Sequence, residues 1–233
     1  MSKSVAILQS NYIPWKGYFD IIHRVDEFIL YDDMQYTRRD WRNRNKIKTP
    51  QGVQWLTIPV EVKGKYEQKI KDTLVSRSDW AETHWKTLLH NYRKAPHFGD
   101  YAGALQGLYE QAGQQPALSG INYLFLKAIC GWLGITTRIT WSMDYQLAAG
   151  KTERLVDLCQ QAGAAHYLSG PAARAYIDEA LFAAAGIALE FMDYSGYPEY
   201  PQLYPPFEHG VSVLDLLFQT GADAPRFMKS FAR

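Results

Sequence analysis

The sequence has only two cysteines among its 233 residues, Cys130 and Cys159, and both lie in stretches with helical periodicity. Neither belongs to a CxxC pair or to a spacing typical of zinc ligands, so we expect buried free thiols rather than a disulfide or a catalytic pair. A glycine-rich phosphate loop is also missing. The sequence therefore signals neither a metal site nor Walker-type nucleotide chemistry.

Long hydrophobic runs and an excess of one charge are absent as well. No apolar run approaches the roughly 20 residues that cross a bilayer, and polar residues at Gln9 and Asn11 come too early for a signal peptide. The net charge is +1, and 47% of the residues are hydrophobic. We therefore expect a cytoplasmic globular protein without a membrane span, with residues 1–233 forming a single α/β domain.

Hydrophobic periodicity predicts strands that alternate with helices along much of the chain. The predicted strands cover residues 5–8, 27–31, 54–60, 135–141, 166–169 and 187–192. The predicted helices cover residues 17–25, 152–162, 172–185 and 212–219, and a mostly helical middle subdomain covers 80–133, with breaks near Pro96 and Pro116. Residues 35–52 look like a long loop. This order favours an α/β fold with a mainly parallel sheet and a helical middle insertion.

Polar and aromatic side chains follow the first predicted strand in "QSNYIPWKGYFD", where a tight turn would be expected. Asp32 and Asp33 close the second strand, and Ser169 closes a later one. In open α/β sheets ligands bind at the carboxyl ends of the strands, so we expect Leu8, Tyr31 and Ser169 along one binding edge. The candidate ligand-binding residues from the first strand end are Gln9, Asn11, Tyr12, Trp15 and Tyr18.

Positive charge is concentrated in residues 38–48, where six cations and one acid give +5 in a chain of +1. A solvated surface loop, a phosphate or pyrophosphate site and a nucleic-acid surface all remain possible for such a run. The near-neutral total and the lack of a second basic block make nucleic acid the least favoured. The candidate substrate-binding residues of this segment are Gln35, Arg38, Arg42, Asn43, Arg44 and Lys46.

Two further features carry open alternatives. His84 recurs at helical spacing with Trp80 and Leu88, which is more typical of a core histidine than of a catalyst, yet imidazole exchanges protons near neutral pH. His84 is therefore a candidate general base beside Asp33 and Asp32. The segment "YSGYPEYPQLYPPFEH", residues 194–209, is rich in tyrosine and proline and is either a lid over a ligand or a fixed connection.

The blocks "LQSNYIPWKGYFDII", "DEFILYDDMQYTRRDWRNRNKIK", "WLTIPV", "YRKAP", "YLSG" and "SVLDLLF", in this order, resemble the WbqC-like family over nearly the whole chain. One departure is Ser10, which stands where the family pattern usually has proline. The resemblance implies a bacterial cytoplasmic protein encoded with enzymes of O-antigen or other surface-polysaccharide biosynthesis. A weaker resemblance links a Rossmann-like sheet here to HxGH nucleotidyltransferases, whose two histidines would correspond to Trp15 and Tyr18.

Together these features suggest a pocket for a nucleotide-linked amino sugar, with amides and rings for the sugar or base and cations for a diphosphate. We hypothesise transfer of an acyl or aminoacyl group to the sugar amine, with Asp33 or His84 as general base. The donor would be a small molecule or a carrier protein acting as co-substrate, with no tightly bound cofactor. The alternatives are a nucleotidyltransferase-like enzyme with a degenerate HxGH motif and a non-enzymatic nucleotide-sugar-binding protein.

Overall fold

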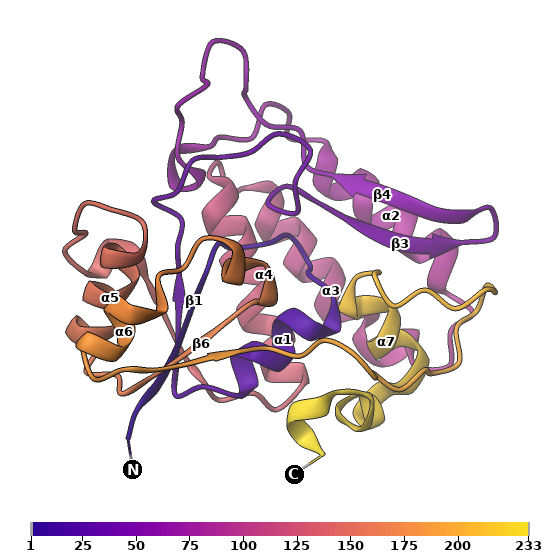
Figure 1. The fold of residues 1–233 in the computed structure, drawn as a ribbon. Coiled ribbons are helices and arrows are strands. Elements are labelled where there is room, and N and C mark those ends of the chain that lie inside the picture. Colours follow the sequence, from indigo (N-terminus) through magenta and orange to yellow (C-terminus); the bar gives the residue numbers. More distant parts are fainter. Residues whose placement is uncertain (1, 233) are drawn as a thin grey trace.

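A central sheet of five parallel strands organises the protein (Figure 1), and the computed structural model describes residues 2–232. The strands are β1 (Ser4–Leu8), β2 (Glu27–Leu30), β5 (Arg138–Trp141), β6 (His166–Ser169) and β7 (Ala188–Phe191). Their order in the sheet is β5-β2-β1-β6-β7. This doubly wound order confirms a Rossmann-like α/β fold, with the topological switch point between β1 and β6.

Alternating side chains of the central strands are buried on both faces of the sheet. Val5 and Ile7 of β1 belong to one hydrophobic cluster together with residues of α5 (Thr152–Gln161) and α6 (Glu179–Ala184). Ala6 and Leu8 contact the larger cluster on the opposite face, which includes α1 (Lys16–His23) and α7 (Val213–Thr220). Apolar residues on both sides of the pleat explain why these strands pair in parallel beneath covering helices. All strand carboxyl ends consequently meet at one edge, as predicted.

Three helices form the predicted helical middle. They are α2 (Trp80–Tyr92), α3 (Phe98–Gly113) and α4 (Leu118–Trp132). Pro96 lies between the first two helices and Pro116 precedes the third, which confirms the expected breaks, since proline cannot continue a helix. Buried residues of all three helices join the larger hydrophobic cluster with β1 and β2.

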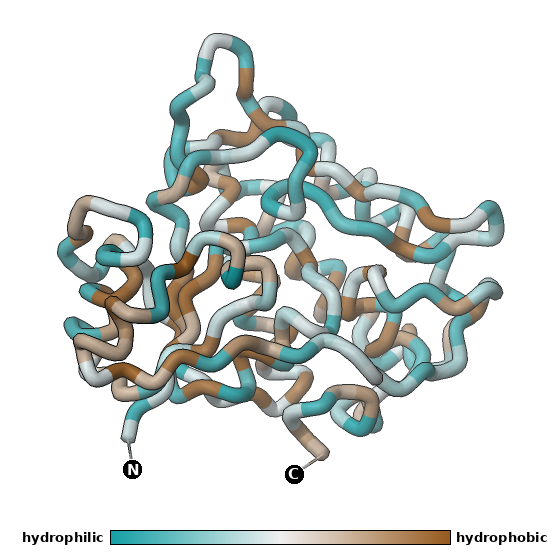
Figure 2. Tube along the Cα trace, viewed as in Figure 1, coloured by the Kyte–Doolittle hydropathy of each residue, from teal (hydrophilic) through white to brown (hydrophobic). Residues whose placement is uncertain are grey.

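The prediction of a long loop over residues 35–52 was wrong. The structure forms an antiparallel hairpin of β3 (Arg44–Thr49) and β4 (Gly52–Thr57), separate from the main sheet. The cations of β3 hid its period of two, in which Asn45 and Ile47 point inward and are buried. The hairpin extends at the right of Figure 2, with hydrophilic stretches interrupted by single hydrophobic ones. The predicted strand 54–60 therefore belongs to this hairpin and ends at Thr57.

The predicted continuous helix over residues 172–185 was also wrong. A short 3₁₀ helix, η3 (Pro171–Ala175), comes first, and α6 begins only at Glu179. The side chain of Asp178 accepts a hydrogen bond from the Ala180 backbone N–H at 3.0 Å and caps the new helix, which ends the irregular stretch before it. The other 3₁₀ helices are η1 (Ile70–Asp72), η2 (Ser142–Asp144), η4 (Gly221–Phe227) and η5 (Lys229–Phe231).

Both cysteines are free and buried, as predicted. Cys130 lies on α4 and Cys159 lies on α5. Burial raises the pKa of each thiol to about 12. At neutral pH both thiols are therefore protonated and behave as small apolar side chains rather than nucleophiles.

The tyrosine- and proline-rich segment crosses the molecule from β7 to α7 (Figure 1). Tyr197 and Tyr200 are buried. The Tyr197 hydroxyl donates to the buried carboxylate of Asp20, and the Tyr200 hydroxyl donates to Asp215 at 2.8 Å. These contacts favour the fixed connection over the lid, because closing and opening would break hydrogen bonds to buried charges.

We predict that Asp215→Ala lowers the free energy of unfolding by about 2 kcal/mol, because it leaves two buried donors without an acceptor at about 1 kcal/mol each. These donors are the hydroxyls of Tyr92 and Tyr200, both at 2.8 Å from the Asp215 carboxylate. Urea unfolding measures the change. The matched control is Asp223→Ala, whose carboxylate is exposed and forms a surface pair expected to contribute less than about 1 kcal/mol. Equal losses in both variants would contradict the prediction.

Candidate functional site

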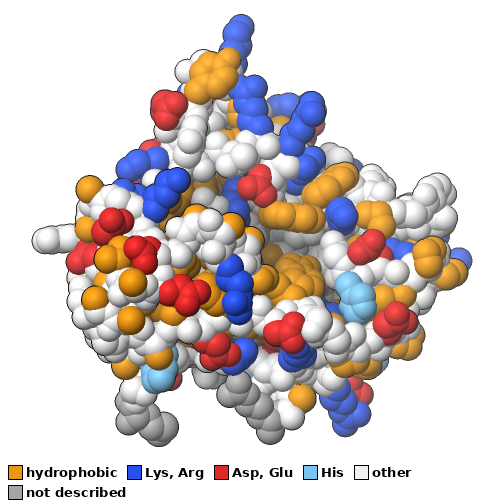
Figure 3. All heavy atoms as spheres, in the orientation of Figure 1, with side chains coloured by type: hydrophobic (Ala, Val, Ile, Leu, Met, Phe, Trp, Pro, Cys, Tyr) orange, Lys and Arg blue, Asp and Glu red, His pale blue; other side chains and the backbone are white. Residues whose placement is uncertain are grey.

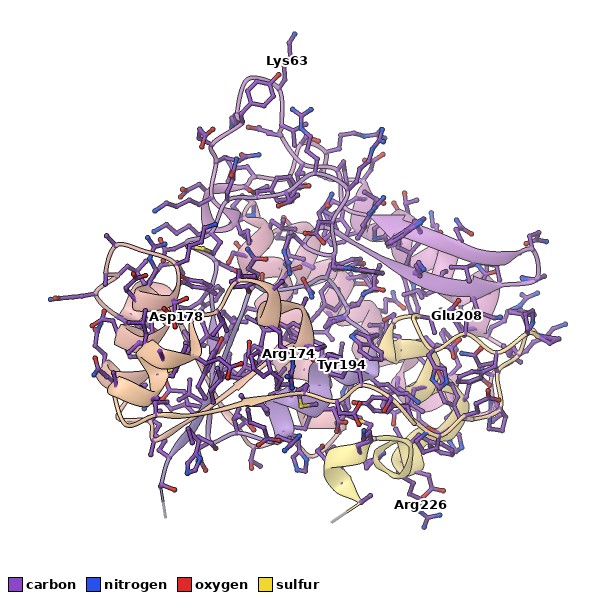
Figure 4. All side chains as sticks on the ribbon, viewed as in Figure 1. Lys63, Arg174, Asp178, Tyr194, Glu208 and Arg226 are labelled. Atoms are coloured by element: carbon purple, nitrogen blue, oxygen red, sulfur yellow. The ribbon has the colours of Figure 1, made fainter. Side chains whose placement is uncertain are left out.

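The surface is hollowed where the carboxyl ends of the strands meet the hairpin, and Figure 3 shows hydrophobic side chains at the floor with Lys and Arg side chains around it. In Figure 4, Arg174 and Tyr194 are labelled beside this hollow. We define the strand-end site by the residues whose contacts connect the β1–α1 loop, the hairpin and the segment after β7. These residues are Asn11, Trp15, Trp41, Arg42, Arg44, Lys46, Trp55 and Tyr194.

The loop between β1 and α1 has a strained but firmly held backbone. Ile13 has a φ of 35°, which is unusual for a β-branched residue. Nδ2 of Asn45 donates to the backbone carbonyls of Tyr12 at 3.1 Å and Ile13 at 3.0 Å, and thereby holds the turn from the hairpin side. The turn presents Asn11 before the bend and Trp15 after it.

Arg42 supplies a largely buried cation to the site, with its side chain only 15% exposed. Its guanidinium donates to Oδ1 of Asn11, and its nearest carboxylate oxygen, on Asp40, is 3.6 Å away. Burial lowers the pKa of Arg42, which nonetheless stays charged at neutral pH. A guanidinium has five N–H donors, so most of them are left for solvent or for a ligand.

Asp32 holds the loop between β1 and α1 and is fully buried. It accepts hydrogen bonds from the Ser10 backbone N–H at 2.8 Å and from the Ser119 hydroxyl. Burial raises its pKa, although these hydrogen bonds and the charge of Arg42 oppose the shift. Nδ2 of Asn122 completes the network through the Ser10 hydroxyl and the Arg42 carbonyl, both at 2.9 Å. Asp32 therefore positions the loop that carries Asn11.

One face of the hairpin carries cations and exposed indole rings. Lys46 pairs directly with Trp55 across the ladder, so both side chains lie on the same face as Arg44. The Arg44 guanidinium lies 4.0 Å from the Trp55 ring centroid, and Lys46 Nζ lies 5.5 Å from it. Trp41 reaches the same face from the preceding loop, with its ring 5.2 Å from that of Trp55.

The two candidate bases have partners outside the strand-end site. The Asp33 carboxylate accepts from Lys71 Nζ at 2.7 Å and from the Ser142 hydroxyl at 2.9 Å. Burial opposes its ionisation, but these contacts outweigh burial and lower its pKa. His84 is 5% exposed and shares a hydrogen bond of 2.9 Å with the Tyr12 hydroxyl. Burial lowers the pKa of His84 to about 4.

Several other predicted residues shape the surroundings of the site. The side chains of Gln35 and Arg38 donate to backbone carbonyls of the 61–69 loop, at Tyr66 and Val62, both at 2.7 Å. The Tyr18 hydroxyl donates to the Gln9 carbonyl at 2.8 Å.

The remaining predicted residues are also held by contacts within the protein. The Tyr12 ring is fully buried, and Ser169 is 3% exposed. Nδ2 of Asn43 donates to the Ile58 carbonyl at 2.8 Å and so fastens the base of the hairpin.

Reasoning from the sequence did not name Trp41, Trp55 and Lys16 as site residues, and it included Tyr194 only as part of a possible lid. The Tyr194 ring lies 5.1 Å from that of Trp15. Lys16 is 2% exposed, donates from Nζ to the Pro198 carbonyl at 2.8 Å, and has its pKa lowered by burial to about 8. Trp55 could have been found from the sequence only by recognising the hairpin. In the hairpin, the cations at 44 and 46 pair with residues 57 and 55, so Trp55 lies on their face.

Two other depressions lie outside the strand-end site. One of about 620 Å³ lies between α6 and β7, and one of about 390 Å³ lies between the hairpin and α2. Their charged side chains, Glu179 and Lys86, are exposed. Neither depression therefore has the buried cation that distinguishes the strand-end site.

Two features are absent from residues 2–232. None of the helices in this range is both long and apolar enough to cross a membrane. Within the same range, no three His, Cys, Asp or Glu side chains are grouped so that they could hold a metal ion.

The fold and the site define a doubly wound α/β protein with a cationic and aromatic pocket at its strand ends. The chain belongs to the WbqC-like protein family, whose model matches residues 9–227. It is 56% identical over 227 residues to the uncharacterized protein Rv1507c of Mycobacterium tuberculosis, covering 97% of this chain and 98% of that protein. No solved structure matches the chain.

We predict that His84 makes stability fall with acidification. Its pKa is about 4 in the folded state, below the ordinary value of 6.5 that we expect when unfolded, so the unfolded state binds the extra proton between these values. The stabilisation is present above pH 6.5 and is lost as the pH falls towards 4. Between pH 7 and pH 5 the wild type should lose about 2 kcal/mol relative to His84→Gln.

Urea unfolding at the two pH values measures this difference. Glutamine retains a donor and an acceptor but does not titrate. His90→Gln, on the exposed side of the same helix, is the matched control and should follow the wild type. A wild type and a His84→Gln variant with parallel pH profiles would show that His84 does not carry the effect.

Proposed function

We propose that this protein transfers an acyl or aminoacyl group to the amine of a nucleotide-linked amino sugar, in the cytoplasm, during O-antigen or other surface-polysaccharide biosynthesis. The observation that carries the proposal is the largely buried guanidinium of Arg42, which lies at the strand ends with most of its donors unused. Removing a cation from water costs free energy, and a bound anion offsets that cost.

A diphosphate is the anion that best fits the charges around Arg42. Arg44 and Lys46 lie over the Trp55 ring on the hairpin strand that begins two residues after Arg42, and Nε of Arg44 is buried without a hydrogen-bond partner among the described residues. Guanidinium groups bind phosphate oxygens in a planar, bidentate geometry. Two arginines and a lysine thus match the two phosphates of a nucleoside diphosphate better than a single carboxylate.

The β1–α1 loop supplies groups suited to a sugar. Asn11 offers an amide beside Arg42, while Trp15 and Tyr194 form an edge-to-face pair with their ring centroids 5.1 Å apart. Sugars bind through amide hydrogen bonds and through contacts of their C–H groups with flat rings. A sugar attached to a diphosphate at Arg42 would meet these groups first.

The transfer itself forms one bond and breaks another. The sugar amine attacks the carbonyl carbon of an acyl thioester or an aminoacyl ester, the bond to sulfur or oxygen breaks, and the leaving group takes up a proton. The nitrogen releases its proton to a base. We propose Asp33 as this base, because its lowered pKa keeps it ionised at neutral pH, and His84 as the alternative.

A second candidate function is a non-enzymatic nucleotide-sugar-binding protein. This alternative is supported by the fact that both candidate bases already have partners. Asp33 is paired with Lys71, and His84 is hydrogen-bonded to Tyr12 in the core. A binding protein needs the cations and rings of the strand-end site but no free base.

We predict that Arg42→Ala weakens binding of a uridine-diphosphate amino sugar by about 1.5 to 3 kcal/mol, the contribution of a charge-assisted hydrogen bond, or roughly 10- to 150-fold in Kd. Arg44→Ala should have a similar effect, and Arg42→Lys a smaller one because lysine keeps the charge without the fork. Isothermal titration calorimetry measures the affinities. Arg77→Ala, at an exposed surface pair, is the matched control. Unchanged affinity in the Arg42 and Arg44 variants would show that neither guanidinium contacts the diphosphate.

A second experiment separates the enzyme from the binding protein. Mass spectrometry follows a uridine-diphosphate amino sugar incubated with acyl thioester and aminoacyl ester donors. We expect an N-acylated product from the wild type, and from Asp33→Asn we expect unchanged sugar affinity with turnover reduced at least tenfold. Binding without any product in the wild type would support the binding protein and overturn the proposed transfer.

A further inference from the structure

Trp41 and Trp55 are the two tryptophans among the exposed large hydrophobic side chains of residues 2–232, at 39% and 37% exposure. Indole rings contribute most to a fold when they are buried, so an exposed pair forgoes stabilisation. A paired exposure next to a cationic site is typical of a surface that is covered by a ligand. The strand-end site therefore has an aromatic component that the packing of the protein does not explain.

The two rings come from different segments and are held in place. Trp41 precedes β3 and Trp55 lies on β4, yet their centroids are 5.2 Å apart with their planes tilted by 41°. The Trp41 carbonyl accepts a hydrogen bond from the Tyr12 backbone N–H at 3.1 Å, which links this ring to the β1–α1 loop. Because the rings are tilted, they do not close on each other as a parallel stack, and flat surface stays available.

Cations surround the pair on the hairpin. Arg44 lies 4.0 Å over Trp55, and Lys46 Nζ is 5.9 Å from the Trp41 ring and 5.5 Å from the Trp55 ring. Arg42 follows Trp41 directly in the chain and points its guanidinium at Asn11. The Trp41 ring, the Arg42 guanidinium and the Asn11 amide therefore follow one another from the hairpin towards the β1–α1 loop. A base, a diphosphate and a sugar follow one another in the same order in a nucleotide sugar.

We infer that the Trp41–Trp55 pair stacks the nucleobase of a nucleoside diphosphate whose phosphates contact Arg42 and Arg44. This inference rests on the proposed function and assigns the residues that bind the base of the nucleotide. Stacking on indole rings stabilises any nucleobase and gains further from neighbouring arginines. A polyprenyl diphosphate or a sugar 1-phosphate has no base to stack, so these ligands would use the cations but leave the rings uncovered.

The test compares uridine diphosphate with inorganic pyrophosphate, by calorimetry and by quenching of tryptophan fluorescence. The wild type should bind uridine diphosphate at least tenfold more tightly than pyrophosphate. Trp55→Leu and Trp41→Leu should each lower the affinity for uridine diphosphate about tenfold or more and leave that for pyrophosphate within about twofold. Arg42→Ala should weaken both. Tyr66→Leu, at a side chain 71% exposed on the 61–69 loop and outside the strand-end site, is the matched control.

Equal affinity of the wild type for the two ligands, or uridine diphosphate binding that is insensitive to both tryptophan changes, would overturn the inference. If a leucine variant fails to fold, Trp55→Phe keeps the test decisive, because a smaller ring should reduce quenching and affinity for uridine diphosphate alone. Tryptophan-dependent binding with no acylated sugar in the mass-spectrometric assay would support stacking of the nucleobase on Trp41 and Trp55 and overturn the proposed transfer. Sugar acylation that depends on neither Trp41 nor Trp55 would support the proposed transfer and overturn the stacking inference.

Discussion

Side-chain hydrogen bonds to the backbone that leaves β1 hold the strand-end site together. Asp32 binds the Ser10 N–H, Asn45 binds two carbonyls of the following turn, and Asn122 joins Ser10 to the Arg42 carbonyl. This backbone cannot form a ladder because it is irregular and buried, so each polar group needs a side-chain partner. The same contacts bring the hairpin and α4 to the strand ends. The position of the buried Arg42 cation depends on them.

Two buried carboxylates hold the segment after β7 in place by hydrogen bonds. Asp215 accepts hydrogen bonds from the hydroxyls of Tyr92 and Tyr200. Asp20 accepts them from the Tyr197 hydroxyl and from the backbone N–H of Ser230, the latter at 2.7 Å. Prolines in this segment lack N–H groups, so a ladder could not hold it. Hydrogen bonds to buried charges are among the stronger ones in proteins and are costly to leave unmade. They fix Tyr194, at the start of the same segment, beside Trp15.

The cations of residues 38–48 are adjacent in the sequence but have separate roles in the structure. Arg38 bonds to the 61–69 loop, Arg42 lies within the site, and Lys48 Nζ donates to the Pro206 carbonyl. Arg38 and Arg42 reach different partners from the loop before β3, whereas Arg44, Lys46 and Lys48 share one face of β3 and meet different partners along it. A basic run that looks like one patch in the sequence thus divides into structural contacts and a smaller set of cations that can meet a ligand.

The sequence by itself determined the parallel sheet, the shared edge of its carboxyl strand ends and the helical middle with breaks near Pro96 and Pro116, because local periodicity and proline report burial and breaks directly. Only the tertiary structure decided what individual polar side chains do. His84 bonds to Tyr12, 72 positions away, and Asp33 bonds to Ser142, 109 positions away. Periodicity along the chain contains no information about such distant partners. The hairpin escaped prediction for the same reason, since the pairing of Lys46 with Trp55 exists only between strands.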